Sequence, residues 1–405
     1  MERAELIELL SGGGLSLLNS MEPYRSADDI LRTVERLRAN GHSASLVAAV
    51  LNQAKLRTRA RSKFGPFTDQ LLFTESGLEQ ATRLDVAAQH AGRFTRAGLT
   101  RVADLGCGIG ADALAIAALE LEVTAVEQDE VTAAVAAYNL APFSHAQVEQ
   151  ADALAFDLSG VDGVYLDPAR RTGSRRRTDP RDWSPSLDFA FDLANRFPTG
   201  IKMGPGVDRD LIPAEAEAQW VSHHREVVEL GLWFGALARP GIKRSALVMS
   251  ASGTAELTAA ADSVDEPVGG LGGYLYEPDG AVIRARLIGD VVRSLNGRMI
   301  DDSIAYFTAD AAHANPFATC FRVLAEFSLD RRVIKRELAA RGVGVLEIKK
   351  RGVDVDPAQF RSQLALAGDA TGTLVLTRLA GRRRALLVER VTPEAGSNPF
   401  SAQYQ

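Results

Sequence analysis

The sequence predicts an α/β protein in three parts: a helical N-terminal region, a parallel-sheet domain and a small α+β domain. Apolar positions such as Ile30, Val34 and Leu37 recur at three- and four-residue spacing near the N-terminus, which is typical of helices. From about residue 100, short β-prone segments alternate with Ala-rich helical segments. Strands separated by helical crossovers form parallel sheets that are covered on both faces. The last segment follows the order strand, helix, strand, helix, strand, strand.

Changes in composition divide the 405 residues into domains, since the chain is longer than one typical domain. The segment after residue 253 is rich in Ala, Gly, Asp and Pro and is interpreted as a linker or loop. We therefore expect a helical region over 1–95, a parallel-sheet domain over 96–253, a linker or loop over 254–272, an α+β domain over 273–392, and a tail over 393–405.

Composition excludes several classes of protein. Hydrophobic residues make up 46% of the chain, which is enough for sizeable cores. The apolar runs are shorter than the roughly 20 residues of a membrane helix, and the N-terminus MERAELIELL does not resemble a signal peptide, so we expect a cytoplasmic protein with no membrane partner. Cys107 and Cys320 cannot form a four-ligand zinc site, and His223 and His224 lack the spacing of metal ligands, so we expect no metal.

The charge of the chain is distributed unevenly. The whole chain carries −6, whereas residues 320–392 hold 15 Lys and Arg against 8 Asp and Glu. A basic segment on an acidic protein favours a polyanionic partner for that segment. A solvated surface with uneven charge remains the alternative. The sequence does not indicate an oligomeric state.

A glycine-rich loop is the first chemical signal. The segment RVADLGCGIGADALAIA reads as a strand, a tight turn at Gly106, Gly108 and Gly110, and a helix. Glycines let a ligand approach the backbone, and open parallel sheets bind ligands at the carboxyl ends of their strands. Glu127, at the end of the next strand, could accept hydrogen bonds from a ribose. The loop alone is compatible with a dinucleotide, with another nucleoside cofactor, or with no ligand.

Three acidic positions separate these possibilities. Asp104 lies under the loop, where a pyrophosphate would have no use for negative charge but an ammonium group would. Asp152 follows a short third strand and is placed to accept from an adenine amino group. Asp167 and Pro168 end the fourth strand. Together they favour a ligand with an amino-acid end over a dinucleotide.

These four motifs, in this order, resemble those of the class I S-adenosylmethionine-dependent methyltransferases, which have a Rossmann-like core. The segments NPFATCFRVLAEF, GVLEIKKRG and LVLTRLAGRRRALLVERV resemble the C-terminal THUMP-like domain of a bacterial methyltransferase family, whose helical N-terminal region is matched by TESGLEQATRLDVAAQHAGRF. THUMP domains proper bind RNA, so the resemblance implies an RNA substrate.

The resemblance implies S-adenosyl-L-methionine as cofactor and a set of site residues. The expected cofactor-binding residues are Asp104, Gly106, Cys107, Gly108, Gly110, Glu127, Gln128, Asp152 and Ala153. Asp167 and Pro168 are the expected catalytic residues. In this family the acid and a backbone carbonyl accept the N–H bonds of an amine and align it for in-line displacement. Cys107 is interpreted as a small residue lining the pocket.

The fourth motif departs from the family pattern. The family has Asp or Asn, Pro, Pro and an aromatic residue, whereas this chain has Ala169 and Arg170 at the last two positions. An ending in arginine resembles the RNA uracil-5 methyltransferases, but those need a nucleophilic cysteine, for which the sequence offers no candidate. We therefore expect methylation of a ring or exocyclic nitrogen rather than of carbon.

Basic residues supply the expected substrate contacts. Six arginines fall between residues 170 and 181, behind the catalytic acid, and could bind phosphates, with Trp183 as a stacking surface. The alternative is a basic loop paired with nearby acids. The expected substrate-binding residues are Arg170, Arg171, Arg175, Arg176, Arg177, Lys202, Lys349, Lys350 and Arg351.

The sequence supports one main function and leaves three alternatives open. The main prediction is methyl transfer from S-adenosylmethionine to a nitrogen of an RNA base in tRNA or rRNA. The alternatives are a small-molecule methyltransferase whose extra domains act as a lid or dimer contact, a non-catalytic RNA-binding protein that retains the cofactor, and a dehydrogenase.

Overall fold

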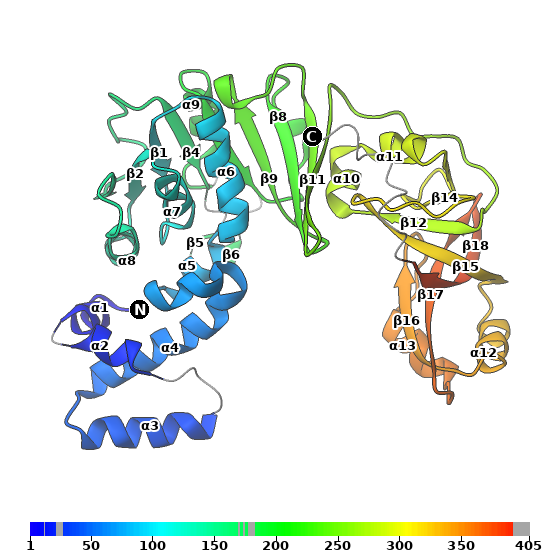
Figure 1. Cartoon of the computed structure of the whole chain (residues 1–405), viewed down its shortest axis with the longest axis horizontal. Helices are drawn as coiled ribbons and strands as arrows, with labels where there is room; N and C mark the ends of the chain where they lie inside the picture. The colour runs from blue at the N-terminus through cyan, green and yellow to red at the C-terminus, as the bar shows by residue number, and fades with distance from the viewer. Residues whose placement is uncertain (12, 22–26, 169–170, 173–174, 177–182, 392–405) are drawn as a thin grey trace. The chain divides into compact units, whose positions relative to one another are not determined.

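The computed structural model describes residues 1–405 apart from 12, 22–26, 169–170, 173–174, 177–182 and 392–405. The chain folds into two compact units (Figure 1). Unit 1 comprises Met1–Met203 and Leu232–Arg239, and unit 2 comprises Gly204–Gly231 and Pro240–Gln405. Each unit has its own buried apolar clusters.

The N-terminal part of unit 1 is helical, as the apolar spacing predicted. Its elements are α1 (Arg3–Leu10), α2 (Gly14–Asn19), α3 (Ala27–Ala39), α4 (Ala44–Phe64), the 3-10 helix η1 (Gly65–Gln70), α5 (Glu75–Gln80) and α6 (Leu84–Arg96). The long helix α4 begins at Ser43, whose hydroxyl accepts the backbone N–H of Leu46 at 3.1 Å. None of the helices in the described part of the chain is both long and apolar enough to cross a membrane.

The rest of unit 1 contains the predicted parallel sheet. Five strands follow the order β7-β4-β1-β2-β3, and each neighbouring pair is parallel. The elements are β1 (Arg101–Leu105), α7 (Ala111–Ala118), β2 (Glu122–Glu127), α8 (Glu130–Leu140), β3 (Ala146–Gln150), β4 (Gly163–Leu166), α9 (Leu187–Ala194) and β7 (Thr199–Met203). Because all five strands point the same way, their carboxyl ends meet at one edge of the sheet.

A buried asparagine joins the helical region to the sheet. Asn139 on α8 accepts the backbone N–H of Leu72 at 2.8 Å and donates to the carbonyl of Leu72 at 3.1 Å. It also donates to the carbonyl of Ile109 at 2.9 Å, just before α7. The segment between η1 and α5 is therefore fixed beside the glycine-rich loop through one side chain, which is 3% exposed.

Unit 2 begins with strands that continue past the predicted domain end. Strand β10 (Arg244–Ser250) is parallel to β8 (Glu217–His223) and antiparallel to β11 (Gly253–Ala259). Strand β9 (Glu226–Phe234) contributes residues to both units. A linker or loop was expected over 254–272, but the first residues of that range form β11. Its small and polar residues suit an edge strand that is mostly part-exposed, so composition alone did not reveal it.

The C-terminal part of unit 2 is an α+β domain around a seven-stranded sheet. The strand order is β13-β14-β12-β15-β18-β17-β16, in which β16 and β17 are parallel. Its elements are β12 (Tyr274–Pro278), α10 (Gly280–Ala285), α11 (Ile288–Ser294), β13 (Arg298–Met299), β14 (Phe307–Ala309), β15 (Ala318–Ser328), α12 (Arg331–Ala339), β16 (Val343–Lys350), α13 (Pro357–Leu364), β17 (Ala370–Leu379) and β18 (Arg382–Arg390). From β15 onward this is the order that the sequence predicted.

Replacing Asn139 with alanine should destabilise unit 1. The change leaves three buried backbone groups without their partner, which we expect to lower the free energy of unfolding by about 2–4 kcal/mol. Urea unfolding followed by tryptophan fluorescence measures the effect. Asn195→Ala, at an exposed position after α9, is the matched control. Equal stability of the two variants would contradict this role of Asn139.

Candidate active site

A cavity of about 590 Å³ lies at the carboxyl edge of the unit 1 sheet. Its volume suits a ligand of the size of a nucleoside derivative. Many of the residues that the sequence assigned to the cofactor or the acceptor line this cavity: Asp104, Gly106, Cys107, Gly108, Glu127, Gln128, Asp152, Ala153 and Asp167. Gly110 and Pro168 are each adjacent in sequence to a lining residue.

The glycine-rich loop has the tight turn that its composition predicted. Gly106, Gly108 and Gly110 have φ angles of 82°, 56° and 86°, in the region that favours glycine. The Gly108 N–H donates to a carboxylate oxygen of Glu127 at 3.0 Å, which holds the loop against the end of β2. A Cβ atom on Gly108 would meet no atom within 4 Å. The loop backbone therefore borders open space that a ligand can fill.

Asp104, at the end of β1, is buried without full compensation. It is 1% exposed, and its Oδ2 atom has no hydrogen-bond partner among the residues that the structure describes. Burial raises the pKa of Asp104 well above its ordinary value, and the carboxylates of Asp112 and Asp167 raise it further. A cationic group in the cavity would pair with the Asp104 carboxylate and would offset both its burial and the repulsion from Asp112 and Asp167. The site therefore fits a ligand with an ammonium group.

The remaining predicted cofactor residues have local roles as well. Burial raises the pKa of the Cys107 thiol well above its ordinary value, so the thiol is neutral and is a poor nucleophile. Glu127 also accepts the backbone N–H of Asp129 at 2.9 Å. Asp152 is exposed, follows β3 and accepts the N–H of Leu154 at 2.9 Å. A carboxylate offers about four lone-pair sites, so both acids retain acceptor capacity for a ligand.

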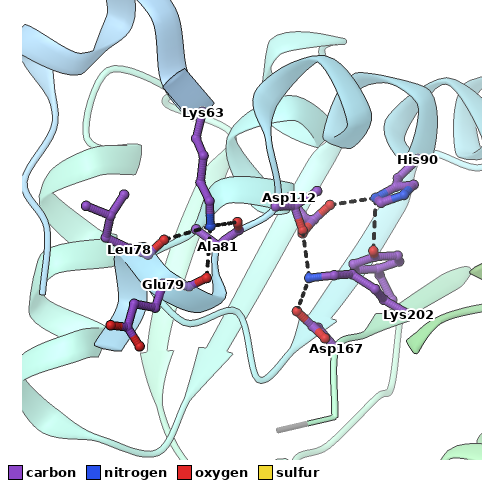
Figure 2. A network of polar contacts seen from close by, with 10 residues as sticks. Lys63, Leu78, Glu79, Ala81, His90, Asp112, Asp167 and Lys202 are labelled. Carbon is purple, nitrogen blue, oxygen red and sulfur yellow. Dashed lines mark hydrogen bonds and ion pairs between the residues drawn. The ribbon is translucent and has the colours of Figure 1, made fainter. Parts of the chain in front are cut away.

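A chain of polar contacts connects Asp167 to the interior (Figure 2). The Lys202 ammonium forms an ion pair with Asp167 and donates to the Thr82 hydroxyl at 3.0 Å. Thr82 donates to Asp112 at 2.7 Å, and the Nδ1 atom of His90 lies 2.7 Å from the other oxygen of Asp112. Burial opposes ionisation of Asp112, but the hydrogen bond and charge of His90, together with Lys202 and Thr82, hold its pKa below the ordinary value.

A second lysine fixes the helix that borders the cavity (Figure 2). The ammonium of Lys63 donates to three backbone carbonyls at the end of α5, those of Leu78, Glu79 and Ala81, at 2.8, 2.9 and 2.8 Å. Burial, together with the charges of Lys202 and Arg83, lowers the pKa of Lys63 to about 8. Lys63 thus caps the C-terminal end of α5, just before Thr82.

Comparison with known proteins gives matches along most of the chain. Two proteins named as uncharacterized S-adenosylmethionine-dependent methyltransferases, from two strains of Mycobacterium tuberculosis, are each 32% identical over 333 residues, which are 80% of this chain and 90% of theirs. The chain belongs to the S-adenosylmethionine-dependent methyltransferases. Its cofactor is therefore S-adenosylmethionine, as the motifs and the unpartnered oxygen of Asp104 indicated.

Three further matches describe the fold and the domains of this methyltransferase. Residues 318–390 match the model of the THUMP domain-like family, and residues 2–60 match the model of a domain of unknown function. The crystal structure of a "putative methyltransferase" from Porphyromonas gingivalis aligns with a TM-score of 0.73 at 22% identity, over 96% of this chain and 99% of that one, which shows the fold. The predicted class I methyltransferase fold with a C-terminal THUMP-like domain is confirmed.

The predicted substrate contacts in unit 1 of the methyltransferase are only partly described by the structure. Arg171, Arg175 and Arg176 belong to a short hairpin of β5 (Arg171–Thr172) and β6 (Arg175–Arg176), of which only the backbone is described. Arg170 and Arg177 lie outside the described residues. Lys202 was expected as a phosphate contact, but its charge is directed at Asp167.

One expected contact in unit 1 is wrong. Trp183 was expected to offer a stacking surface, but it is 8% exposed. Its large apolar ring is buried ahead of α9, so it cannot present a face to a base.

The predicted substrate contacts in unit 2 of the methyltransferase differ in their exposure and in whether their charge is paired. Lys349 forms an ion pair with Glu277 at 2.8 Å, and although burial opposes ionisation of Glu277, this pairing lowers its pKa. Lys350 is exposed, and the Arg351 guanidinium lies 5.4 Å from the ring centre of Tyr306. The charge of Lys349 is thus compensated within the domain, whereas Lys350 faces solvent.

Sequence reasoning missed the contribution of the helical region to the cavity. Ser76, Gly77, Gln80 and Thr82 line it from the segment that includes α5. Asp112 lines it from the first turn of α7, two residues after the glycine-rich loop. The resemblance in TESGLEQATRLD was a signal for this segment, but helical periodicity alone gave these polar residues no role.

Replacing Lys63 with methionine should loosen α5. The substitution leaves three carbonyls without their donor, so we expect amide hydrogen exchange over residues 75–81 to accelerate about tenfold or more. Hydrogen exchange with mass spectrometry measures the change. Lys55→Met, at an exposed position of α4, is the control. Unchanged exchange over 75–81 would show that Lys63 does not hold α5.

Proposed function

We propose that this methyltransferase transfers a methyl group to a nitrogen of an RNA base in tRNA or rRNA. The observation that carries the proposal is a cluster of cations on the THUMP-like domain, which we call the basic cluster. It comprises Lys350, Arg351, Arg378, Arg382 and Arg383.

The geometry of the basic cluster favours an anionic partner. Arg378 on β17 and Arg383 on β18 are direct cross-strand partners, and like charges in this position repel each other. The Arg378 guanidinium donates to the carbonyl of Gly352 at 2.8 Å, which places it beside Arg351. No ion pair of Lys350, Arg382 or Arg383 occurs among the residues that the structure describes. A phosphate backbone would relieve this repulsion.

The side chains around the cavity provide the other requirements for methyl transfer. Bound S-adenosylmethionine supplies an electrophilic methyl group. We assign Asp104 to its ammonium, Glu127 to its ribose and Asp152 to its adenine. Asp167 then accepts an N–H of the acceptor base and aligns the nitrogen for in-line displacement. Pro168 and the arginines of 170–177 are assigned to the acceptor side of the same site.

Cofactor binding should depend on pH through Asp104. Its carboxyl must be ionised to bind an ammonium, and its pKa is raised, so we expect affinity to rise with pH by up to about tenfold per unit below that pKa. Calorimetric titration with S-adenosylhomocysteine between pH 5 and 8 measures this. Asp104→Asn should bind more weakly and lose the pH dependence. Asp188→Asn, on the exposed surface of α9, should behave as wild type. A pH-independent wild type would contradict the assignment of Asp104.

Radiolabelled methyl transfer tests the RNA proposal directly. Unmodified tRNA and rRNA transcripts, bulk protein and a metabolite extract are offered separately to wild type and to Asp167→Asn. We expect label in RNA from wild type and at least about 100-fold less from the variant. Label in metabolites alone would overturn the RNA proposal and favour a small-molecule methyltransferase.

Charge reversal in the basic cluster separates RNA binding from catalysis. Lys350→Glu combined with Arg383→Glu should reduce RNA methylation about tenfold or more at physiological salt, with unchanged cofactor affinity, because phosphate contacts are lost. Lys55→Glu reverses one charge on α4, outside the basic cluster, and is the control for charge reversal at an exposed position. Full activity of the double variant would exclude the basic cluster as the RNA contact.

A further inference from the structure

The ion pair of Lys202 and Asp167 is a consequence of strand register. In the parallel pair β4 and β7, Leu166 lies opposite Ile201, so the next residues, Asp167 and Lys202, are neighbours at the carboxyl edge of the sheet. The side chain of Lys202 is 14% exposed and that of Asp167 is 31% exposed. A cation therefore stands beside Asp167, which lines the cavity, at a partly shielded position where charge interactions are stronger than in water.

Buried groups hold the Lys202 ammonium in this position. Thr82, which accepts from it at 3.0 Å, is itself 5% exposed and is fixed by its bond to Asp112. The other charged groups that act on Lys202 come from three elements: Asp104 on β1, Asp112 on α7 and Lys63 on α4. The ion pair with Asp167 and the hydrogen bond to Thr82 therefore orient the Lys202 ammonium.

A fixed cation at this point favours one class of acceptor. An amine nitrogen changes from neutral to cationic as its bond to the methyl carbon forms, and an adjacent ammonium opposes that change. A lactam nitrogen first loses its proton, and the negative charge spreads over the nitrogen and the neighbouring carbonyl oxygen. An adjacent ammonium stabilises this charge. Proton transfer to Asp167 merely moves the negative charge from one partner of Lys202 to another.

We propose that the acceptor is a lactam nitrogen, N1 of guanine or N3 of uracil, and that Lys202 stabilises the charge on the neighbouring carbonyl oxygen; this inference rests on the proposed RNA function. The N–H proton moves to Asp167, and the electron pair left on nitrogen forms the N–CH3 bond. The S–CH3 bond breaks with its electron pair remaining on sulfur. The products are the N-methylated base, S-adenosylhomocysteine and a protonated Asp167, which later releases its proton to solvent.

Identification of the methylated nucleoside is the first test. Unmodified tRNA and rRNA transcripts are treated with the full-length enzyme and S-adenosylmethionine, digested to nucleosides and analysed by mass spectrometry against standards. We expect methyl on N1 of guanosine or N3 of uridine. Methyl on an exocyclic amine of adenosine, cytidine or guanosine would overturn the lactam assignment and leave the RNA proposal intact. No methyl in RNA would overturn the proposed function, and the lactam assignment with it.

Variants of Lys202 provide an independent test on the same RNA. Lys202→Met should lower kcat about 100-fold or more, and its rate should rise about tenfold per pH unit between pH 6 and 8, because the base must ionise without help. Lys202→Arg should restore part of the rate. A pH-independent rate for Lys202→Met, or a rate equal to that of wild type, would overturn the role of Lys202.

Cofactor binding controls for folding of these variants. Calorimetry with S-adenosylhomocysteine should still show binding by Lys202→Met, although weaker than wild type because Lys202 no longer lowers the pKa of Asp104. Lys55→Met should match wild type in both binding and rate. If binding is lost in Lys202→Met, the comparison is made between wild type and Lys202→Arg, which keeps the charge. A pH-dependent rate in Lys202→Arg like that expected without the charge, or an exocyclic amine product, would overturn the proposal.

Discussion

Unit 1 depends on balancing negative charge at one edge of its sheet. Parallel pairing brings Asp104 and Asp167 to the same edge, and the first turn of α7 adds Asp112. Buried carboxylates at close range raise one another's pKa and cannot all ionise without partners. Lys202 compensates Asp167, and His90 and Thr82 compensate Asp112. One oxygen of Asp104 has no hydrogen-bond partner in the described part of the chain. Of these three carboxylates, Asp104 is therefore the one whose negative charge is not balanced, and Asp104 lines the cavity.

Much of the sheet and of the cofactor pocket could be predicted from the sequence, because both follow from local patterns. Short β-prone segments between Ala-rich ones marked the parallel strands, and helix α8 occupies one of these Ala-rich segments, EVTAAVAAYNL. Since the carboxyl ends of parallel strands share one edge, acids at or just after the ends of β1, β3 and β4 were expected to line one cofactor site. Asp104, Asp152 and Asp167 all line the cavity.

The contacts between distant segments could not be predicted in the same way. The pairing of Lys202 with Asp167 requires the register of β4 against β7, which the apolar pattern of each strand leaves open. Thr82 occurs in a helical region whose periodicity says nothing about a distant cavity. The burial of Trp183 and the edge strand β11 were missed for the related reason that composition suggested exposed loops.

The bond between Thr82 and Asp112 has a consequence for inheritance of the fold. A polypeptide that begins at residue 96 keeps every strand of the unit 1 sheet, yet it lacks Lys63, Thr82 and His90. Asp112 would then lose both of its hydrogen-bonding side chains, and the cavity would lose the wall that α5 provides. The helical region and the sheet therefore have to be inherited together. Recombination that exchanged one without the other would leave Asp112 without the hydrogen bonds of Thr82 and His90.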